Sequence, residues 1–247
     1  MYKRQNHFRA IAITIAGFDP SGGAGVLADI KTFENMKVYG LAVNTGITIQ
    51  NDFHFEHVFW QKEMEIKAGM RILSRRFPVK AAKLGIHENL ESVYNSINNL
   101  KLFWPDVKIV WDPVLSSSCG YDFHIDLAKA DLDKILNSID LITPNEFEFE
   151  ALGIKESDYP CALLKKGGHS SGKYAIDDLF IHGKKKKSFK SLRKNGIQKH
   201  GSGCVLSSAI TSGLAQGESL TQSVANAKKY INRFLVSNKT LSGYHKN

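Results

Sequence analysis

A short glycine-rich run in the last fifth of the chain has the residue types that bind an anion. The run consists of Gly201, Ser202, Gly203 and Cys204, and the apolar stretch 205–214 follows it directly. Two glycines let several backbone N–H groups face one point, and the positive end of the helix expected to begin there strengthens their field. The same field should favour the thiolate of Cys204, which makes this side chain a plausible base or nucleophile. Phosphoryl transfer needs an anion pocket of this kind.

A second glycine-rich segment, residues 17–25, follows an expected strand and opens an expected helix. Its Gly23-x-Gly25-x-x-Ala28 spacing matches the dinucleotide fingerprint, but the next expected strand ends at Gln50 without the acidic residue that would hold a ribose. A ligand-binding loop and a turn that only packs helix against strand therefore both stay open. The amide of Gln50 could pair with the edge of a heterocycle, or it could simply cap its strand.

Polar side chains also follow later strands. Asn145 and Glu148 have the spacing of a helix capping box, and they could also hold Mg²⁺ through water, because Mg²⁺ keeps several waters and takes few carboxylates. Asp112 could serve a metal or phosphates, or form a turn with the proline after it. Lys166 could neutralise phosphate charge, or only precede a glycine turn. Taken together, six loops of this kind at one rim are hard to explain by packing alone.

The elements that must position these residues alternate along the chain. Nearly continuous apolar runs predict strands that are buried on both faces, at 11–15, 41–49, 81–85, 108–112, 141–143 and 162–165. Helical patterns are found at 26–36, 62–76, 89–99, 127–137, 146–152, 203–214 and 219–236. We therefore predict an α/β fold, a mostly parallel sheet between two helix layers. A hairpin of 175–181 and 188–192, with the lysines 184–187 at its tip, should lie at one edge. Ligands bind beyond the carboxyl ends of the strands in such sheets.

The composition fits one globular domain, residues 1–247, and excludes several classes of protein. Hydrophobic residues make up 43% and charged residues 23%, and no apolar run reaches the length of about 18 residues that crosses a membrane. The cysteines at positions 119, 161 and 204 form no CxxC pair, which argues against a disulfide framework or zinc site and favours the cytoplasm. The net charge of +9 would attract nucleotides, although a solvated basic surface explains it more simply. No aromatic residues interleave with the lysine run to indicate nucleic-acid binding.

With these residues the chain resembles the hydroxymethylpyrimidine kinase/phosphomethylpyrimidine kinase family of thiamin biosynthesis, within the ribokinase-like superfamily. The matching segments follow the family's order over nearly the whole chain, and they read TIAGFDPSGGAGVLADIKTF, NTGITIQN, KLGI, DPVLSSSCG, LITPNEFEFEAL, KKGGH, HGSGCVLSSAI and AKKYI. The resemblance implies a three-layer ribokinase-like fold and a kinase that uses ATP and Mg²⁺. It would phosphorylate 4-amino-5-hydroxymethyl-2-methylpyrimidine and then its monophosphate, as a homodimer without a nucleic-acid or membrane partner.

The resemblance also implies roles for single residues. The catalytic position and its anion hole fall on Cys204, Gly201, Ser202 and Gly203. The residues against the pyrimidine are Gln50, Asp19 and Gly17. The residues toward the phosphates and the nucleotide are Asn145, Lys166, Lys228 and Asp112. The N-x-x-E motif that organises Mg²⁺ through water in that family falls on Asn145 and Glu148.

The chain departs from the family pattern at a few places. Ser202 replaces a threonine, which keeps the hydroxyl. Phe18 and the pair Ile86-His87 alter the substrate side, and the link between Leu152 and Leu163 lacks one helix of the family. A pyridoxine or pyridoxal kinase of the same superfamily is therefore an alternative, and a non-catalytic nucleotide-binding protein is another.

Overall fold

One sheet runs through the whole structure, a computed structural model that describes residues 9–116, 123, 125–168, 173–193 and 198–245. Its nine strands lie in the order β3-β2-β1-β4-β5-β6-β7-β8-β9. The strands are β1 (Ile11–Phe18), β2 (Tyr39–Gln50), β3 (Phe55–Trp60), β4 (Ala81–Leu84), β5 (Lys108–Trp111), β6 (Leu141–Ile142), β7 (Ala162–Lys165), β8 (Tyr174–Ile181) and β9 (Lys184–Leu192). The six strands from β2 to β7 in that order are parallel, as the continuous apolar runs predict.

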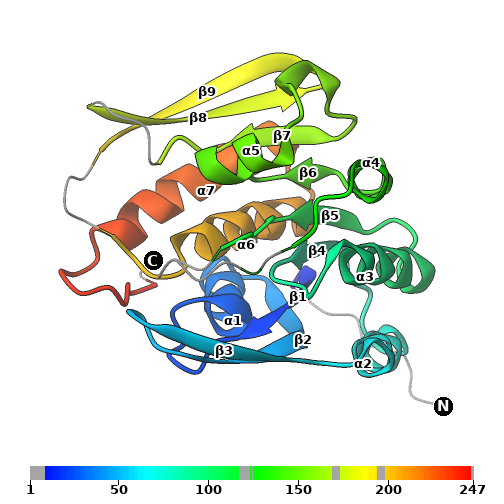
Figure 1. Cartoon of the computed structure of the whole chain (residues 1–247). Helices are drawn as coiled ribbons and strands as arrows, with labels where there is room; N and C mark the ends of the chain where they lie inside the picture. The colour runs from blue at the N-terminus through cyan, green and yellow to red at the C-terminus, as the bar shows by residue number, and fades with distance from the viewer. Residues whose placement is uncertain (1–8, 117–122, 124, 169–172, 194–197, 246–247) are drawn as a thin grey trace.

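Helices cover both faces of the sheet (Figure 1), which confirms the predicted three-layer α/β fold. One layer contains α2 (Glu63–Ser74), α3 (Leu90–Phe103), α4 (Lys129–Leu136) and α5 (Glu146–Leu152), and the other contains α1 (Gly25–Asn35), α6 (Ser202–Ala215) and α7 (Leu220–Leu235). Every predicted strand and helix is present, with ends shifted by a few residues. The link between α5 and β7 holds one 3₁₀ turn, Glu156–Asp158.

Side chains of β1 alternate between the two layers. Ile11, Ile13 and Ile15 belong to the core under α2, α3 and α4. On the opposite face, Ala12 packs in the cluster that includes Phe33 of α1, and the small side chains on that face let α1 and α6 approach the sheet closely. The strand order reverses beside β1, because β2 lies on one side of it and β4 on the other. This reversal is where open parallel sheets place their ligands.

Both edges of the sheet are antiparallel, and the sequence predicted only one of them. The strand β3 pairs antiparallel with β2 and was missed, because only Phe55 and Val58 of its six residues are buried. The search for continuous apolar runs does not detect such a half-exposed edge strand.

The hairpin β8–β9 lies at the other edge as predicted, but its tip is different. The chain turns at His182 and Gly183, which have φ angles of 50° and 69°. The four lysines begin β9 and are exposed along the strand. Their charge discourages strands of other molecules from pairing with this sheet edge.

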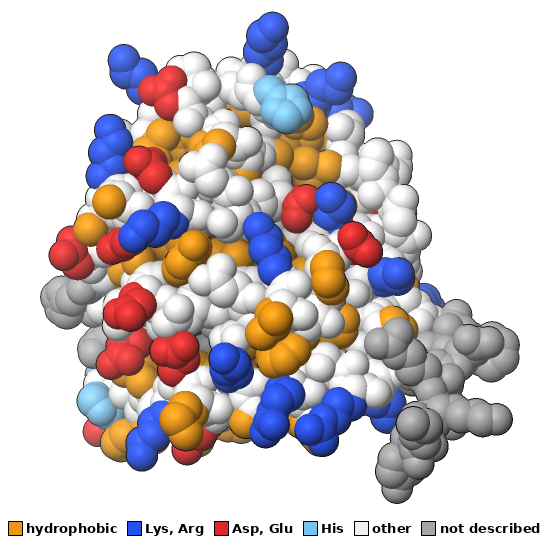
Figure 2. Space-filling view, turned by 90° about the vertical axis from the view of Figure 1, so that its right-hand side faces the viewer, with side chains coloured by type: hydrophobic (Ala, Val, Ile, Leu, Met, Phe, Trp, Pro, Cys, Tyr) orange, Lys and Arg blue, Asp and Glu red, His pale blue; other side chains and the backbone are white. Residues whose placement is uncertain are grey.

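The described residues contain no helix long and apolar enough to cross a membrane. On the face over α2, α3 and α4, basic side chains are scattered among acidic and apolar ones and form no continuous patch (Figure 2).

The turn from β1 into α1 depends on a glycine. Gly25 has a φ of 56°, and a Cβ there would collide with the backbone carbonyl of Gly17. We expect Gly25→Ala to lower the free energy of unfolding clearly more than Gly217→Ala, a matched control with a φ of 84° and no atom near its added Cβ. The control should cost only the left-handed backbone penalty of about 1–2 kcal/mol. Urea unfolding of both variants measures the difference, and equal losses would contradict the crowding argument.

Candidate active site

A cavity of about 1160 Å³ lies beyond the carboxyl ends of the parallel strands. All twelve residues singled out from the sequence line it, and they are Gly17, Asp19, Gln50, Asp112, Asn145, Glu148, Lys166, Gly201, Ser202, Gly203, Cys204 and Lys228. The cavity exceeds the usual size for one small ligand, so it has room for two substrates side by side. Cys119, the third cysteine, lies outside the described residues.

The predicted anion loop forms the N-terminus of α6. Gly201 is the N-cap with a φ of 70°, and no side chain of the described residues caps this end of the helix. The first N–H groups of a helix have no partner within it, so this end keeps donors for an anion. A Cβ at Gly201 would collide with the carbonyl of Gly23. Close contact with the other glycine-rich segment, residues 17–25, therefore positions this loop.

A buried carboxylate joins the two glycine-rich loops. Asp19 accepts hydrogen bonds from the backbone of Ser21 and Ala24, both at 2.8 Å. Its Oδ2 also lies 2.8 Å from Nε2 of His200, the residue before the anion loop. Burial alone would raise the pKa of Asp19, but the hydrogen bonds from His200, Ser21 and Ala24 outweigh it and lower the pKa. Asp19 is therefore an ionised tether at the cavity wall.

Cys204 differs from the expectation of a stabilised thiolate. Burial raises its pKa to about 11, and Asp29 and Asp112 act in the same direction. Lys83 and the N–H of Gly25 oppose this shift without reversing it. The expectation from the helix end alone was wrong, because it left out the cost of burying a charge. The Cys204 thiol is therefore neutral at pH 7.

Two carboxylates and a lysine meet under the anion loop. Nζ of Lys166 lies 2.9 Å from Oδ1 of Asp112 and 3.8 Å from Oε2 of Glu148. Asp112 also accepts hydrogen bonds from Thr143 and Ser207. Burial raises the pKa of Glu148 to about 7, and the negative charge of Asp112 adds to the shift while Lys166 opposes it. Glu148 would therefore ionise readily beside a bound cation.

The capping box predicted at the start of α5 is present. Glu148 accepts from the backbone N of Asn145 at 2.7 Å, and Asn145 accepts from the backbone N of Glu148 at 2.9 Å. Among the described residues, no group of three or more His, Cys, Asp or Glu side chains could cage a metal. Mg²⁺ needs only one or two carboxylates when phosphates complete its shell, so the pair Asp112 and Glu148, with the shifted pKa of Glu148, fits this ion.

A second lysine, Lys228, lines the cavity and is mostly covered by its neighbours. Nζ of Lys228, on α7, lies 2.6 Å from Oδ2 of Asp177 on β8. Asp177 also accepts a hydrogen bond of 3.0 Å from the backbone N of Gly167, the residue after Lys166. Helix α7, strand β8 and the loop after β7 thus hold Lys228 and Lys166 on one side of the cavity.

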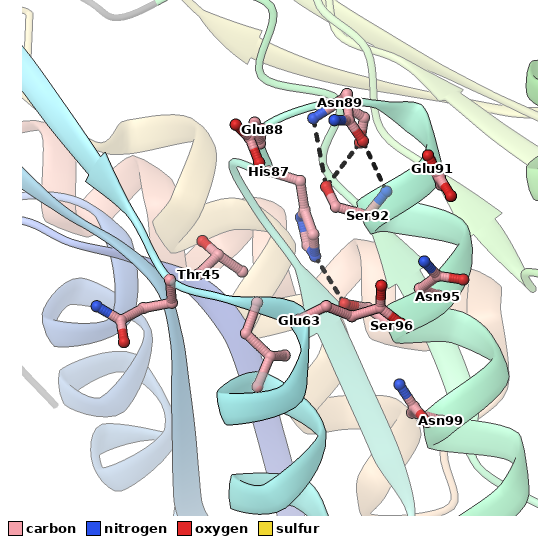
Figure 3. A pocket seen from close by; sticks show the side chains of 12 residues that line it. Thr45, Glu63, His87, Glu88, Asn89, Glu91, Ser92, Asn95, Ser96 and Asn99 are labelled. Carbon is pink, nitrogen blue, oxygen red and sulfur yellow. Dashed lines mark hydrogen bonds between the residues drawn. The ribbon is translucent and has the colours of Figure 1, made fainter.

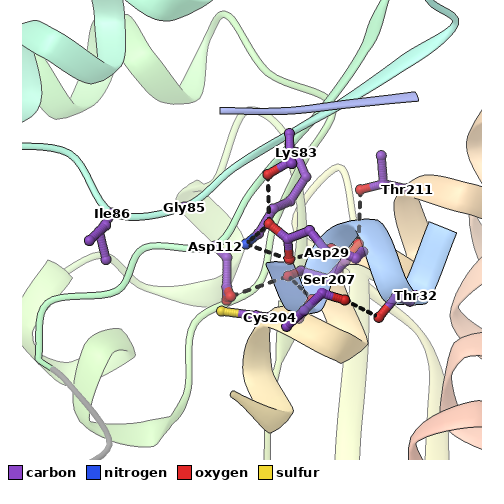
Figure 4. A network of polar contacts seen from close by, with 12 residues as sticks. Asp29, Thr32, Lys83, Gly85, Ile86, Asp112, Cys204, Ser207 and Thr211 are labelled. Atoms are coloured by element: carbon purple, nitrogen blue, oxygen red, sulfur yellow. Dashed lines mark hydrogen bonds and ion pairs between the residues drawn. The ribbon is translucent and has the colours of Figure 1, made fainter. Parts of the chain in front are cut away.

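Lys83 is a cavity residue to which the sequence analysis gave no role. It is fully buried, and its Nζ lies 3.0 and 2.9 Å from the two carboxylate oxygens of Asp29 on α1 (Figure 4). Thr14 of β1 and Ser208 of α6 donate to the same carboxylate, both at 2.6 Å. Burial would lower the pKa of Lys83, but Asp29 outweighs it and raises the pKa. A lysine inside an otherwise apolar strand, Ala81-Ala82-Lys83-Leu84, was the available signal.

The residues that depart from the family pattern affect the cavity less than expected. Ile86 lines the cavity, but neither Phe18 nor His87 is among its lining residues. His87 is buried and turned toward α3, where its ring contacts Ser96. Of these three positions, only Ile86 lines the cavity.

The chain matches the family model described as phosphomethylpyrimidine kinase over residues 19–247. It is 37% identical to the hydroxymethylpyrimidine/phosphomethylpyrimidine kinase of Aquifex aeolicus, over 95% of this chain and 98% of that protein. It is 34% identical to the protein of the same name from Rhizobium meliloti, over 90% and 89%.

Solved structures agree with these matches. The phosphomethylpyrimidine kinase of Clostridium difficile superposes with a TM-score of 0.73 at 32% identity, covering 91% of this chain and 99% of that one. The pyridoxal kinase of Staphylococcus aureus in complex with ADP gives a TM-score of 0.82 at 21% identity, covering 95% and 92%. At this low identity the second match supports the fold alone.

We expect Lys83→Met to lower the free energy of unfolding by about 3–5 kcal/mol, because it leaves a buried Asp29 charge unpaired. Adding Asp29→Asn should recover most of the loss, since Asn keeps an acceptor for Thr14 and Ser208. Lys108→Met is the matched control on the neighbouring strand, where the partner Asp140 is solvent-exposed, and it should cost about 0–1 kcal/mol. Urea unfolding measures all three, and a Lys83→Met loss as small as the control's would refute the prediction.

Glu148→Gln tests the raised pKa of Glu148. The folded chain keeps a proton on Glu148 up to about pH 7, whereas the unfolded chain releases it near the ordinary value of 4.5. Glu148 therefore lowers the free energy of unfolding as pH rises from about 4.5 to 7. Gln can still form the capping box but does not titrate, so the variant lacks this loss. The unfolding free energy of the variant minus that of the parent should increase from pH 5 to pH 8. A difference that stays flat or falls would show that Glu148 ionises normally.

Proposed function

The chain belongs to the phosphomethylpyrimidine kinase family, and from this premise we propose how its cavity phosphorylates a hydroxymethylpyrimidine and then the monophosphate product. The chain is a kinase of thiamin biosynthesis, and we propose ATP as its phosphate donor. The observation that carries the proposal is that the twelve predicted residues line one cavity large enough for both substrates.

The two substrates approach the anion loop from opposite sides. The pyrimidine lies against Gly17 and Gln50, at the carboxyl ends of β1 and β2, and the Gln50 amide pairs with its ring edge. ATP lies toward Lys166 and Lys228 with its terminal phosphate at the start of α6. Holding the alcohol and the phosphate in line lowers the entropic part of the barrier.

The backbone supplies most of the transition-state stabilisation. The transferred phosphoryl group carries charge on its three outer oxygens, and the amides of residues 201–204 face them at the positive end of α6. A single donor in such a hole contributes about 2.7–4 kcal/mol. Lys166 adds positive charge on the nucleotide side.

Mg²⁺ would be held by Asp112 and Glu148 together with the phosphates, and through water by Asn145. When bound, it neutralises phosphate charge. Lys166 already contacts both carboxylates, so it orients them for a cation and its phosphate ligands. Glu148, whose pKa burial raises to about 7, would be ionised beside such a cation, because a neighbouring positive charge lowers the pKa of a carboxyl group.

Cys204 orients the alcohol. Its thiol is neutral at pH 7, so we propose that it forms a hydrogen bond with the hydroxymethyl oxygen and does not act as a general base. Loose phosphoryl transfer requires little deprotonation of the nucleophile before the bond to phosphorus forms.

The chain works as one domain in the cytoplasm. A single sheet provides both the substrate side and the nucleotide side of the cavity, and a compartment that keeps thiols reduced suits the free cysteines 161 and 204.

We also propose a homodimer through the exposed face of β2 and β3. Ile47 and Phe59 are cross-strand partners and are 42% and 58% exposed, and Ile49 beside them is 42% exposed. A second copy would cover this apolar face with its own. Phe59→Glu should halve the mass measured by light scattering, whereas Leu102→Glu, an exposed control on α3, should not. A parent chain that is already monomeric would contradict the dimer.

Mass spectrometry of the products tests the function. The chain with excess ATP and Mg²⁺ should convert 4-amino-5-hydroxymethyl-2-methylpyrimidine to the monophosphate and then to the diphosphate. Pyridoxine in the same assay should give a much lower kcat/KM, because only Ile86 changes the substrate wall. A higher kcat/KM for pyridoxine would establish the alternative, and ATP left unconsumed with either alcohol would contradict a kinase.

Substitution of Cys204 tests the orienting role. Cys204→Ala should lower kcat/KM by about 10²-fold, the scale of a misplaced reacting group, while Cys204→Ser should keep most of the activity because the hydroxyl can make the same hydrogen bond. Cys161→Ala, at a buried cysteine outside the cavity, is the control. Equal losses in the Ala and Ser variants would favour a thiolate base instead.

A further inference from the structure

A second cavity of about 220 Å³ lies between the start of α2 and one face of α3 (Figure 3). It shares no lining residue with the large cavity. Its volume is below that of a drug-sized ligand site, so it suits a molecule of one ring. The reaction described above gives this cavity no part.

The wall formed by α3 is polar where a packed helix is normally apolar. Ser92, Asn95, Ser96 and Asn99 follow one another at helical spacing and line the cavity. Ser96 and Asn99 are only 2% and 7% exposed. Ser96 is satisfied by the His87 ring at 3.0 Å, but the amide of Asn99 has no hydrogen-bond partner in the described part of the chain. Among the described residues, this amide is not one of the unpaired side-chain groups that are shut off from solvent, so it opens into the cavity and can bind an occupant there.

The electrostatics of the cavity favour a positive occupant. Carboxylates of Glu63, Glu88 and Glu91 line it, and among the described residues no lysine or arginine does. Two helix ends, those of α2 and α3, contribute about +0.5 charge each, which leaves the net charge negative. Burial lowers the pKa of His87 to about 4, so its ring adds no charge. Its Nδ1 donates to the carbonyl of Gly85 at 3.0 Å, which leaves Nε2 to accept from Ser96.

The two cavities share a wall. Ile86 lines the large cavity and His87 lines the small one. The carbonyl of Ile86 accepts a 2.7 Å hydrogen bond from Thr45, which itself lines the small cavity. A Cβ added at Gly17 would collide with the Ile86 side chain, so Ile86 packs against the loop that receives the substrate. A change in the small cavity therefore reaches the substrate wall through the hydrogen bond from Thr45 to Ile86 and through the peptide bond between Ile86 and His87.

We propose that this second cavity binds a small organic cation that carries N–H donors, an amidinium or protonated amino-heterocycle, and that its binding alters the substrate wall at Ile86. The carbonyl oxygen of Asn99 accepts one N–H group at the base of the cavity, and the three carboxylates balance the charge at its mouth. The binding does not depend on the proposed function, and only its effect on catalysis does.

Titration calorimetry of the full chain tests the binding with three molecules of one shape. Benzamidinium should bind at least tenfold more tightly than neutral benzamide, and benzoate should not bind. Asn99→Leu should weaken benzamidinium binding at least tenfold. Asn98→Leu, at the exposed neighbouring position of α3, should leave it unchanged. Glu63→Gln and Glu91→Gln alter exposed residues, so they report on the charge even if Asn99→Leu fails to fold.

Three results would overturn the proposal. Equal affinity for benzamidinium and benzamide would show that charge plays no part, and equal binding by the parent and Asn99→Leu would place the ligand elsewhere. Absence of benzamidinium binding would mean that the cavity holds only water, which a polar space of this size can do. The coupling is tested separately: saturating benzamidinium should change the KM for the pyrimidine alcohol in the parent but not in Asn99→Leu. An unchanged KM in the parent would overturn the coupling alone.

Discussion

A fully buried ion pair fixes the place where the three parts of the active cavity meet. Lys83 comes from the sheet and Asp29 from α1, and the hydroxyls of Thr14 and Ser208 bring β1 and α6 to the same carboxylate. Charges without solvent must be paired in good geometry, so these elements have little freedom to shift. The start of α6, with its anion loop, is held over the sheet by this junction.

Burial also sets the charge state of the cavity before any ligand arrives. It keeps the Cys204 thiol neutral, and it leaves Glu148 close to half-ionised at neutral pH. Lys83, Lys166 and Lys228 are paired with Asp29, Asp112 and Asp177. Arg193, Lys199 and Lys239 also line the cavity, so its lining has more basic than acidic side chains. The backbone amides at the start of α6 have no titratable group and stay available at any pH.

The position of several site residues could be predicted from the sequence because these residues follow buried strands. Parallel strands bring their carboxyl ends to one edge, so Gln50, Asp112 and Lys166 could be placed near one another without coordinates. The capping box at Asn145 was readable because it depends on residues three apart. The strand β3 was not, because a half-exposed edge has no continuous apolar run. The ion pair of Lys83 could not be predicted either, because its partner Asp29 is 54 residues away in the chain.

The sequence alone determined the layered α/β fold and the order of its main elements, because these follow from local periodicity. Motif spacing and the resemblance to a known family together determined which residues to expect around the cavity. Tertiary structure decided the protonation of Cys204 and Glu148, the pairing of Lys83 and the separate cavity at Asn99. These properties depend on desolvation and on partners far away in the chain, and neither is encoded in any local pattern.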